Sequence, residues 1–150
     1  MCGIVGFWGS SSNSNNSIID KMSNKLISRG PDASGKWINN EIGLAFGHRR
    51  LSIVDLSETG SQPMISKNKR FVISFNGEIY NHLEIRKEIN EKKLYSSWRG
   101  ISDTETLLVS IETFGFEKTL SMITGMFAFS LWDSDKNILY LTRDRIGEKP

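Results

Sequence analysis

Residues 125–132, Gly-Met-Phe-Ala-Phe-Ser-Leu-Trp, constrain the fold most, because apolar side chains occupy both of the alternating faces that a strand would have. A sheet with one face in water needs apolar residues only at every second position. We therefore expect both faces of this strand to be covered. The economical arrangement is two antiparallel sheets packed on each other with helices outside them, an α+β fold organised as a four-layer α/β/β/α sandwich.

Further strands are expected where short apolar or β-branched runs are bounded by turn-forming residues. The turn-forming residues 133–137 predict a hairpin between residues 125–132 and the strand that follows. The Ser- and Asn-rich residues 10–16 predict a loop. The other strand candidates are residues 2–8, 35–38, 42–48, 71–76 and 138–141.

Apolar residues at helical spacing predict three helices, at residues 18–26, 82–93 and 103–114. Gly30 and Pro31 provide a stop signal after the first helix. Asn81 is a candidate N-cap for the second helix, and Glu84 completes a capping-box pattern with it. Asp103 is a candidate N-cap for the third helix.

The bulk composition excludes several classes of protein. A chain of 150 residues without a linker or repeat predicts one domain over residues 1–150, and a net charge of +2 gives no basic field for nucleic acid. No stretch approaches the roughly 18 apolar residues of a membrane span. The single cysteine excludes an intramolecular disulfide and fits a reducing compartment, by default the cytoplasm. Residues 82–84 match half of a zinc deaminase motif, but its PCxxC half is missing, so no metal site is expected.

Cys2 carries the candidate chemistry. Removal of Met1 would leave a thiol and a free α-amine on one carbon, and an amine with a pKa of about 8 can accept the thiol proton. The alternative is that Cys2 is a small buried hydrophobe, as free cysteines often are. With Met1 attached, the nitrogen of Cys2 is an amide without basicity, so we expect that form of the protein to be inactive.

Several segments together resemble the glutaminase domain of glutamine-hydrolysing asparagine synthetases. These are class II glutamine amidotransferases with the N-terminal-nucleophile hydrolase fold. An N-terminal Cys-Gly-Ile-Val-Gly is shared by sugar and purine amidotransferases of this class, whereas Arg-Gly-Pro-Asp and Asn-Gly-Glu-Ile-Tyr-Asn-His favour the asparagine-synthetase branch. The segments that carry the resemblance are residues 2–6, 29–35, 48–55, 75–82, 102–105 and 142–147.

The resemblance implies a catalytic set of Cys2, Asn76 and Gly77. Cys2 would be the nucleophile, while the side-chain amide of Asn76 and the backbone N–H of Gly77 would hold the oxyanion. Taken alone, Asn76-Gly77 also fits a turn at the end of a strand. A histidine base is not required, so we expect replacement of His48 or His82 to leave measurable turnover.

The resemblance also implies a substrate-binding set. Arg50 would bind the α-carboxylate of glutamine through its two-pronged guanidinium, although without the family match Arg49 is an equal candidate. Asp103 would bind the α-ammonium, although a helix cap also explains it. For Arg29 and Asp32 we expect a structural role. The remaining members of the set are Leu51, Ser52, Ile53 and Val54, through their main-chain groups, and Glu78.

By the same resemblance, the chain would hydrolyse the side-chain amide of L-glutamine through a Cys thioester. The ammonia would pass to an ATP-dependent synthetase domain that makes asparagine from aspartate. That domain would follow Pro150, so the fold would be truncated at its C-terminus, with a possible homo-oligomer forming at an open sheet edge. No cofactor is expected in this domain, since ATP and Mg belong to the synthetase domain. The alternatives are a silent glutamine-binding or regulatory domain and a glutaminase serving another acceptor.

Overall fold

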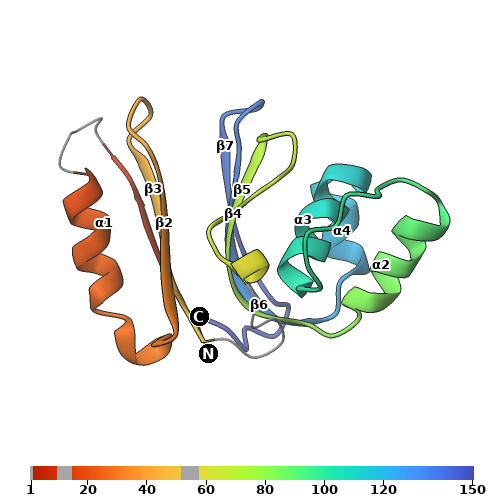
Figure 1. Ribbon diagram of the computed structural model, residues 1–150, viewed down its shortest axis with the longest axis horizontal. Coiled ribbons are helices and arrows are strands. Elements are labelled where there is room, and N and C mark those ends of the chain that lie inside the picture. Colours follow the sequence, from red (N-terminus) through yellow and green to blue (C-terminus); the bar gives the residue numbers. More distant parts are fainter. Residues whose placement is uncertain (1, 10–14, 52–57) are drawn as a thin grey trace.

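The computed structural model describes residues 2–9, 15–51 and 58–150. Two antiparallel sheets pack face to face, and helices cover their outer faces (Figure 1). The predicted α+β class and the four-layer order are confirmed. One outer layer is helix α1 (Asn15–Asn24), and the other contains helices α2 (His82–Glu91), α3 (Asp103–Phe114) and α4 (Phe116–Met122). In the described part of the chain, none of the helices has the length and apolar character needed to cross a membrane.

The first sheet has the strand order β1-β3-β2. It contains β1 (Gly3–Trp8), β3 (Leu44–Arg50) and β2 (Ala33–Asn39). Gly3 pairs with Arg49, and Ala33 pairs with Arg50. The beginnings of β1 and β2 therefore lie beside the end of β3, at one end of the sandwich. This brings Cys2, which precedes β1, close to Arg50.

Helix α1 begins earlier in the sequence than expected. Its first residue, Asn15, belongs to the stretch predicted to be a loop, but it is buried and its Nδ2 donates to Asn40 Oδ1 at 3.4 Å. The helix ends at Asn24, so Leu26 lies beyond it, just before the short 3-10 helix η1 (Ile27–Arg29). The helix packs closely on the sheet because Gly47 of β3 has no side chain, and a Cβ there would lie 2.3 Å from Ser23 Oγ.

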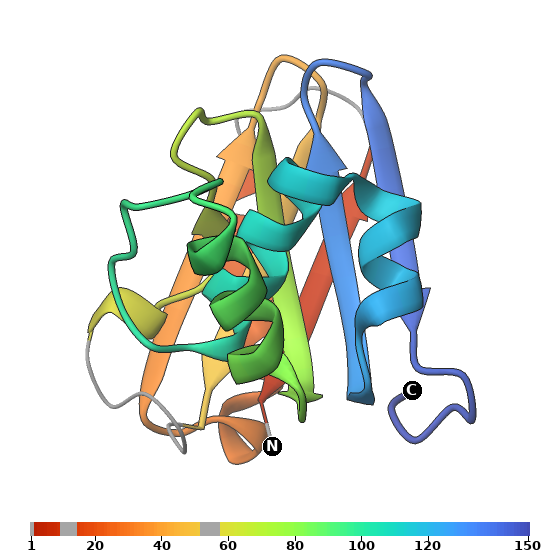
Figure 2. The same ribbon diagram turned by 90° about the vertical axis from the view of Figure 1, so that its right-hand side faces the viewer.

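The second sheet has the strand order β4-β5-β6-β7. It contains β4 (Met64–Ile65), β5 (Phe71–Ile79), β6 (Gly125–Asp133) and β7 (Ile138–Arg143), with the 3-10 helix η2 (Glu58–Gly60) before β4. Strand β6 is largely buried, with the helices on one face and the first sheet on the other, as its apolar pattern predicted (Figure 2). The hairpin of β6 and β7 is also as predicted.

The residues of β5 divide between two interior layers. Phe71, Ile73 and Phe75 belong to the large apolar cluster under helices α2 to α4. Val72 belongs to a small cluster between the two sheets, with Leu44, Phe46 and Trp132. Because side chains alternate along a strand, Ser74 and Asn76 follow Val72 onto the face that meets the first sheet.

Of the two predicted N-caps, Asp103 is wrong, and Asn81 is correct in position but makes no side-chain cap bond. The N-cap of α3 is Ser102, whose Oγ accepts the N–H of Glu105 at 3.2 Å, and Asp103 is the first helical residue. Asn81 precedes α2 but does not cap it with its side chain. Its amide instead donates to Met122 O and accepts from Thr124 N, each at 2.9 Å, and so ties the start of α2 to the end of α4.

Candidate active site

Cys2 lies at the start of β1, beside the main chain that follows β3. Its Sγ accepts the N–H of Leu51 at 3.4 Å and lies 3.6 Å from the Leu51 carbonyl oxygen. The side chain is partly exposed, and the thiol is free. A hollow of about 610 Å³ adjoins Leu51 between Arg29 and Lys149. The sulfur is therefore not sealed in the apolar core.

The two arginines at the end of β3 point in opposite directions. Arg49 points toward α1, where its Nε donates to Ser23 O at 3.2 Å and its Nη2 donates to Asn24 Oδ1. His48 points the other way and reaches the second sheet. Because residues two apart on a strand share a face, Arg50 lies on the same inner face as His48. The pattern of alternation, which sequence reasoning did not use, separates the two arginines.

His48 joins the two sheets. Its Nε2 lies 3.2 Å from the carbonyl oxygen of Phe75 on β5. A carbonyl can only accept, so Nε2 carries the proton and Nδ1 is left as an acceptor. The side chain is 1% exposed, and burial lowers the pKa of His48 from 6.5 to about 4, against a smaller upward effect of the bond to Phe75. The imidazole is therefore neutral at neutral pH. Among the described residues, no hydrogen bond links it to Cys2.

Asn76 and Gly77 lie within a strand and do not form a turn. They pair with Ala128 and Phe127 of β6. A Cβ on Gly77 would lie 2.2 Å from the carbonyl oxygen of Met126, so this close approach of two strands requires glycine. Asn76 is 5% exposed, and within the described residues its Oδ1 has no hydrogen-bond partner. This spare capacity is that of an acceptor, so an oxyanion would have to be bound by the Nδ2 group of the same amide.

Asp103 lies beside the end of β5. It is 7% exposed, and its Oδ2 accepts the N–H of Ile79 at 2.9 Å while its Oδ1 accepts the N–H of Thr104 at 2.8 Å. Burial raises the pKa of the Asp103 carboxyl, and the bond from Ile79 and the nearby His82 offset part of that effect. Glu78 is exposed on β5 and adds to the rise in the pKa of Asp103, so two acidic side chains lie near each other there.

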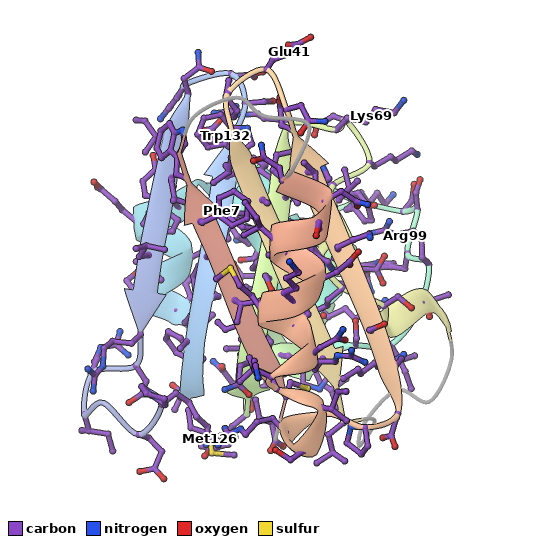
Figure 3. The ribbon with its side chains drawn as sticks, turned by 90° about the vertical axis from the view of Figure 1, so that its left-hand side faces the viewer. Phe7, Glu41, Lys69, Arg99, Met126 and Trp132 are labelled. Atoms are coloured by element: carbon purple, nitrogen blue, oxygen red, sulfur yellow. The ribbon has the colours of Figure 1, made fainter. Side chains whose placement is uncertain are left out.

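These residues gather at one end of the sandwich. Glu78 pairs with Met126 and Asn76 with Ala128, whereas Val72 pairs with Trp132. Figure 3 shows Met126 at the lower end and Trp132 near the upper end, and β1 begins at the lower end. Cys2, Arg50, Asn76 and Asp103 therefore share this end, the first two on one sheet and the others on or beside the second.

The segments around the site are also held in place. A Cβ on Gly30 would lie 2.3 Å from the carbonyl carbon of Arg49, and the N–H of Asp32 donates to Arg50 O at 3.0 Å. At the C-terminal segment, the Asp144 carboxylate accepts N–H groups of Phe127, Glu148 and Lys149 at 2.8 to 3.2 Å. Burial acts to raise the pKa of Asp144, but these donors bring it down to about 2.

Ser52, Ile53 and Val54, which the sequence placed in the substrate-binding set, lie outside the described residues. Sequence reasoning also missed Gln62, a buried residue between η2 and β4. Its Oε1 accepts the N–H of Phe75 at 2.6 Å, and its Nε2 donates to Thr104 Oγ1 at 3.3 Å. A single glutamine in a polar stretch carries no periodic or motif signal, so only the folded chain reveals these contacts.

Comparison with known proteins finds relatives over the whole chain. The chain is 39% identical to asparagine synthetase (glutamine-hydrolyzing) 1 of Bacillus subtilis strain 168, over 100% of the chain and 23% of that protein. It is 37% identical to asparagine synthetase (glutamine-hydrolyzing) 1 of Arabidopsis thaliana, over 98% of the chain and 24% of that protein. The chain thus spans about a quarter of the length of these relatives.

A solved structure shows the same fold. The B. subtilis glutamine phosphoribosylpyrophosphate amidotransferase, complexed with ADP and GMP, superposes with a TM-score of 0.69 at 20% identity, covering 89% of this chain and 35% of that one. This is the N-terminal-nucleophile hydrolase fold. The family model described as a glutamine amidotransferase domain matches residues 1–150. The chain therefore belongs to the glutamine amidotransferase domain family.

Proposed function

We propose that this chain hydrolyses the side-chain amide of L-glutamine, with Cys2 as nucleophile. The observation that carries the proposal is the grouping of Cys2 and Arg50 on one sheet with Asn76 and Asp103 at the same end of the second. A thiol, a cation, a buried amide and a carboxylate match the parts of an amino acid that carries a carboxamide.

The reaction begins at the mature N-terminus. The α-amine of Cys2 takes the thiol proton, and Sγ attacks the amide carbon of glutamine to form a tetrahedral intermediate. The protonated amine then gives its proton to the departing nitrogen, the C–N bond breaks, and ammonia leaves a thioester on Cys2. Water attacks the thioester with the amine again as base, the C–S bond breaks, and glutamate is released. This sequence of steps uses no cofactor in the domain.

Asn76 and Gly77 are the proposed oxyanion donors. The buried position of Asn76 means that its amide dipole is held in a low-dielectric environment before the charge develops, which is where such donors are most effective. Gly77 is held in the strand by its pairing with Phe127, and there is no room for a side chain at this position.

Arg50 and Asp103 are proposed to bind the amino-acid end of glutamine. By resemblance to the family, Glu78 and the main-chain groups of Leu51, Ser52, Ile53 and Val54 are further proposed contacts. The raised pKa of Asp103 reflects a carboxylate that water stabilises poorly, so a bound ammonium ion would replace solvation that the fold has removed. Ammonia would pass to a synthetase domain of a longer chain, as the names of the relatives suggest, with aspartate as the acceptor and ATP and Mg used there. The cytoplasm is the proposed location, and a homo-oligomer is compatible with the scheme.

The test is release of ammonia and glutamate from glutamine by the chain without Met1 and by Cys2→Ala. We expect turnover by the first and none above background by the second, with both folded by circular dichroism. Glutamine binding without turnover by the wild type would instead identify a silent binding domain, the main competing function.

Arg50 and Arg49 give a matched pair for the binding half of the proposal. Arg50→Ala should raise the KM for glutamine by about 10- to 100-fold, because a hydrogen-bonded charge pair contributes about 1.5–3 kcal/mol. Arg49→Ala removes the same charge from the outer face of the same sheet and should leave KM within about twofold of wild type. Equal effects of the two changes would contradict the proposed role of Arg50.

A further inference from the structure

On the side of β4, strand β5 has no paired strand beyond Ile73, although its pairing with β6 continues to Ile79. Strand β4 contains two residues, and its pairs are Met64 with Ile73 and Ile65 with Val72. Continued in the same register, the chain before β4 would set Gln62 opposite Phe75. The pairing of β4 with β5 ends at Met64, and the backbone of Gln62 does not pair with that of Phe75. The β4-side edge of β5 at Phe75 therefore has no backbone partner in β4.

Two side chains bond the backbone of Phe75 there. Gln62 Oε1 accepts the Phe75 N–H at 2.6 Å, and His48 Nε2 donates to the Phe75 carbonyl oxygen at 3.2 Å. Gln62 is 9% exposed and His48 is 1% exposed, so water competes little for either bond. Together they satisfy the backbone N–H and carbonyl oxygen of Phe75, which a longer β4 would otherwise bond. Phe75 is the residue next to Asn76.

Gln62 also connects this point to the proposed ammonium site. Its Nε2 donates to Thr104 Oγ1 at 3.3 Å. The N–H of Thr104 donates to Asp103 Oδ1 at 2.8 Å, and Asp103 Oδ2 accepts the N–H of Ile79 at 2.9 Å. The bonds form a closed loop that leaves β5 beside Asn76, passes through Gln62 to the start of α3, and returns to β5 at Ile79.

We propose that Gln62 is a positioning residue that sets the distance between the oxyanion donor Asn76 and the ammonium partner Asp103. The proposal rests on the glutaminase function proposed above. A side-chain amide suits the position, because it accepts from Phe75 and donates to Thr104 at the same time. A thioether of similar length does neither, and an ionised carboxylate cannot donate.

The size of the effect follows from the geometry of catalysis. A displacement of about 1 Å in a catalytic group can cost about 100-fold in rate. Gln62→Met should therefore lower kcat/KM for glutamine by about 10- to 100-fold per folded molecule. Thr104→Val keeps the side-chain shape and removes only the acceptor of the Nε2 bond, so it should act in the same direction by about 3- to 10-fold.

Thr119→Val is the matched control. Thr119 is fully buried, and its Oγ1 shares a hydrogen bond of 3.1 Å with Ser110 Oγ between α3 and α4, away from the proposed site. It should lose thermal stability about as Thr104→Val does, and its kcat/KM should stay within about twofold of wild type. If the two valine variants instead share the same kinetics, Thr104 has only a structural role.

The experiment measures three quantities for wild type, Gln62→Met, Thr104→Val and Thr119→Val, each corrected for the folded fraction. They are kcat/KM for glutamine, the rate of Cys2 labelling by a glutamine-like electrophile, and the rate of labelling by iodoacetamide. If Gln62 has a positioning role, Gln62→Met and Thr104→Val should lower kcat/KM and slow labelling by the glutamine-like electrophile. Labelling by iodoacetamide should be unchanged, because iodoacetamide has no amino-acid end that Arg50 and Asp103 must bind.

The double variant Gln62→Met with Thr104→Val should be no slower than Gln62→Met alone, since the first change already removes the shared bond. The inference is overturned if wild type turns over glutamine and Thr104→Val matches Thr119→Val in both glutamine-dependent rates. This outcome decides the question even if Gln62→Met fails to fold. A wild type that neither turns over glutamine nor reacts with the glutamine-like electrophile overturns the proposed function itself, and the positioning role with it.

Discussion

Two of the interfaces between layers of the sandwich have opposite chemistry. Between the second sheet and its helices, the buried residues form one large apolar cluster that includes Ile73, Leu108 and Leu131. Between the two sheets, the buried apolar cluster is confined to Leu44, Phe46, Val72 and Trp132. Toward the end of the sandwich where Cys2 lies, the inner face of the sheets carries polar side chains instead.

The polar end of the inner layer also carries unsatisfied groups. Among the described residues, His48 Nδ1, Ser74 Oγ and Asn76 Oδ1 are buried without hydrogen-bond partners. Such groups destabilise a fold, because the water they lost has not been replaced. The interface with the helices therefore supplies most of the buried apolar packing, while the inner layer is less apolar at the end where the proposed site lies. The following predictions test this division.

Leu131→Ala tests the helix layer and should have the largest effect on stability. Leu131 is fully buried on β6, and removal of such a side chain leaves a cavity that costs about 2–5 kcal/mol. Leu141→Ala on the neighbouring strand is the control, because Leu141 is 77% exposed and should change the free energy of unfolding by less than about 0.5 kcal/mol. Urea unfolding measures both. Glutamine turnover per folded molecule should be unaffected in either variant.

Asn76→Ala tests the inner layer and should lower kcat for glutamine. Loss of one oxyanion donor typically lowers kcat by about 100- to 1000-fold. Ser74→Ala is the control, since Ser74 lies two residues earlier on the same face and its hydroxyl makes no bond among the described residues. That change should keep kcat and hold or slightly raise stability. If Asn76→Ala kept kcat within threefold of wild type, Asn76 would not be an oxyanion donor.

His48→Gln tests the buried imidazole through pH. The folded pKa of about 4 lies below the ordinary value of 6.5, so the folded protein binds fewer protons between these two values. His48 therefore contributes its full stability above pH 6.5 and loses it as the pH falls toward 4, by about 3 kcal/mol. The raised pKa of Asp103 acts in the opposite sense, but equally in wild type and variant.

The measurement is the difference in free energy of unfolding between wild type and His48→Gln at pH 7 and pH 4.5. The variant should lose less stability over this range, and it should keep measurable glutamine turnover because the proposed base is an amine. Parallel stability profiles for the two proteins would contradict a buried neutral His48.

The sequence alone predicts the layers well, and the reason is local. Residues 125–132 are apolar on both faces, and a strand with this pattern is stable only when both faces of its sheet are covered. The caps were less predictable, because Ser102 and Asp103 are both good cap residues and only the folded chain shows that Ser102 bonds Glu105. The Asn76-Gly77 pair resembles a turn locally, but its pairing with β6 overrides that preference.

Candidate site residues could be chosen from the sequence only where a motif marked them. Arg49 and Arg50 are equivalent in composition, and their separation depends on strand alternation once β3 is placed between β1 and β2. Gln62 was not predictable, because its two partners, Phe75 and Thr104, are distant in sequence and come together through packing of β5 against α3.

The most direct test of the central account compares glutamine turnover by two forms of the same chain, one with Met1 removed and one with Met1 retained, each verified by intact mass. If the amine and thiol of Cys2 act together, the form without Met1 releases ammonia and the form with Met1 releases none above the level of Cys2→Ala. Equal turnover by the two forms would contradict the account, because the base would then be some group other than the terminal amine.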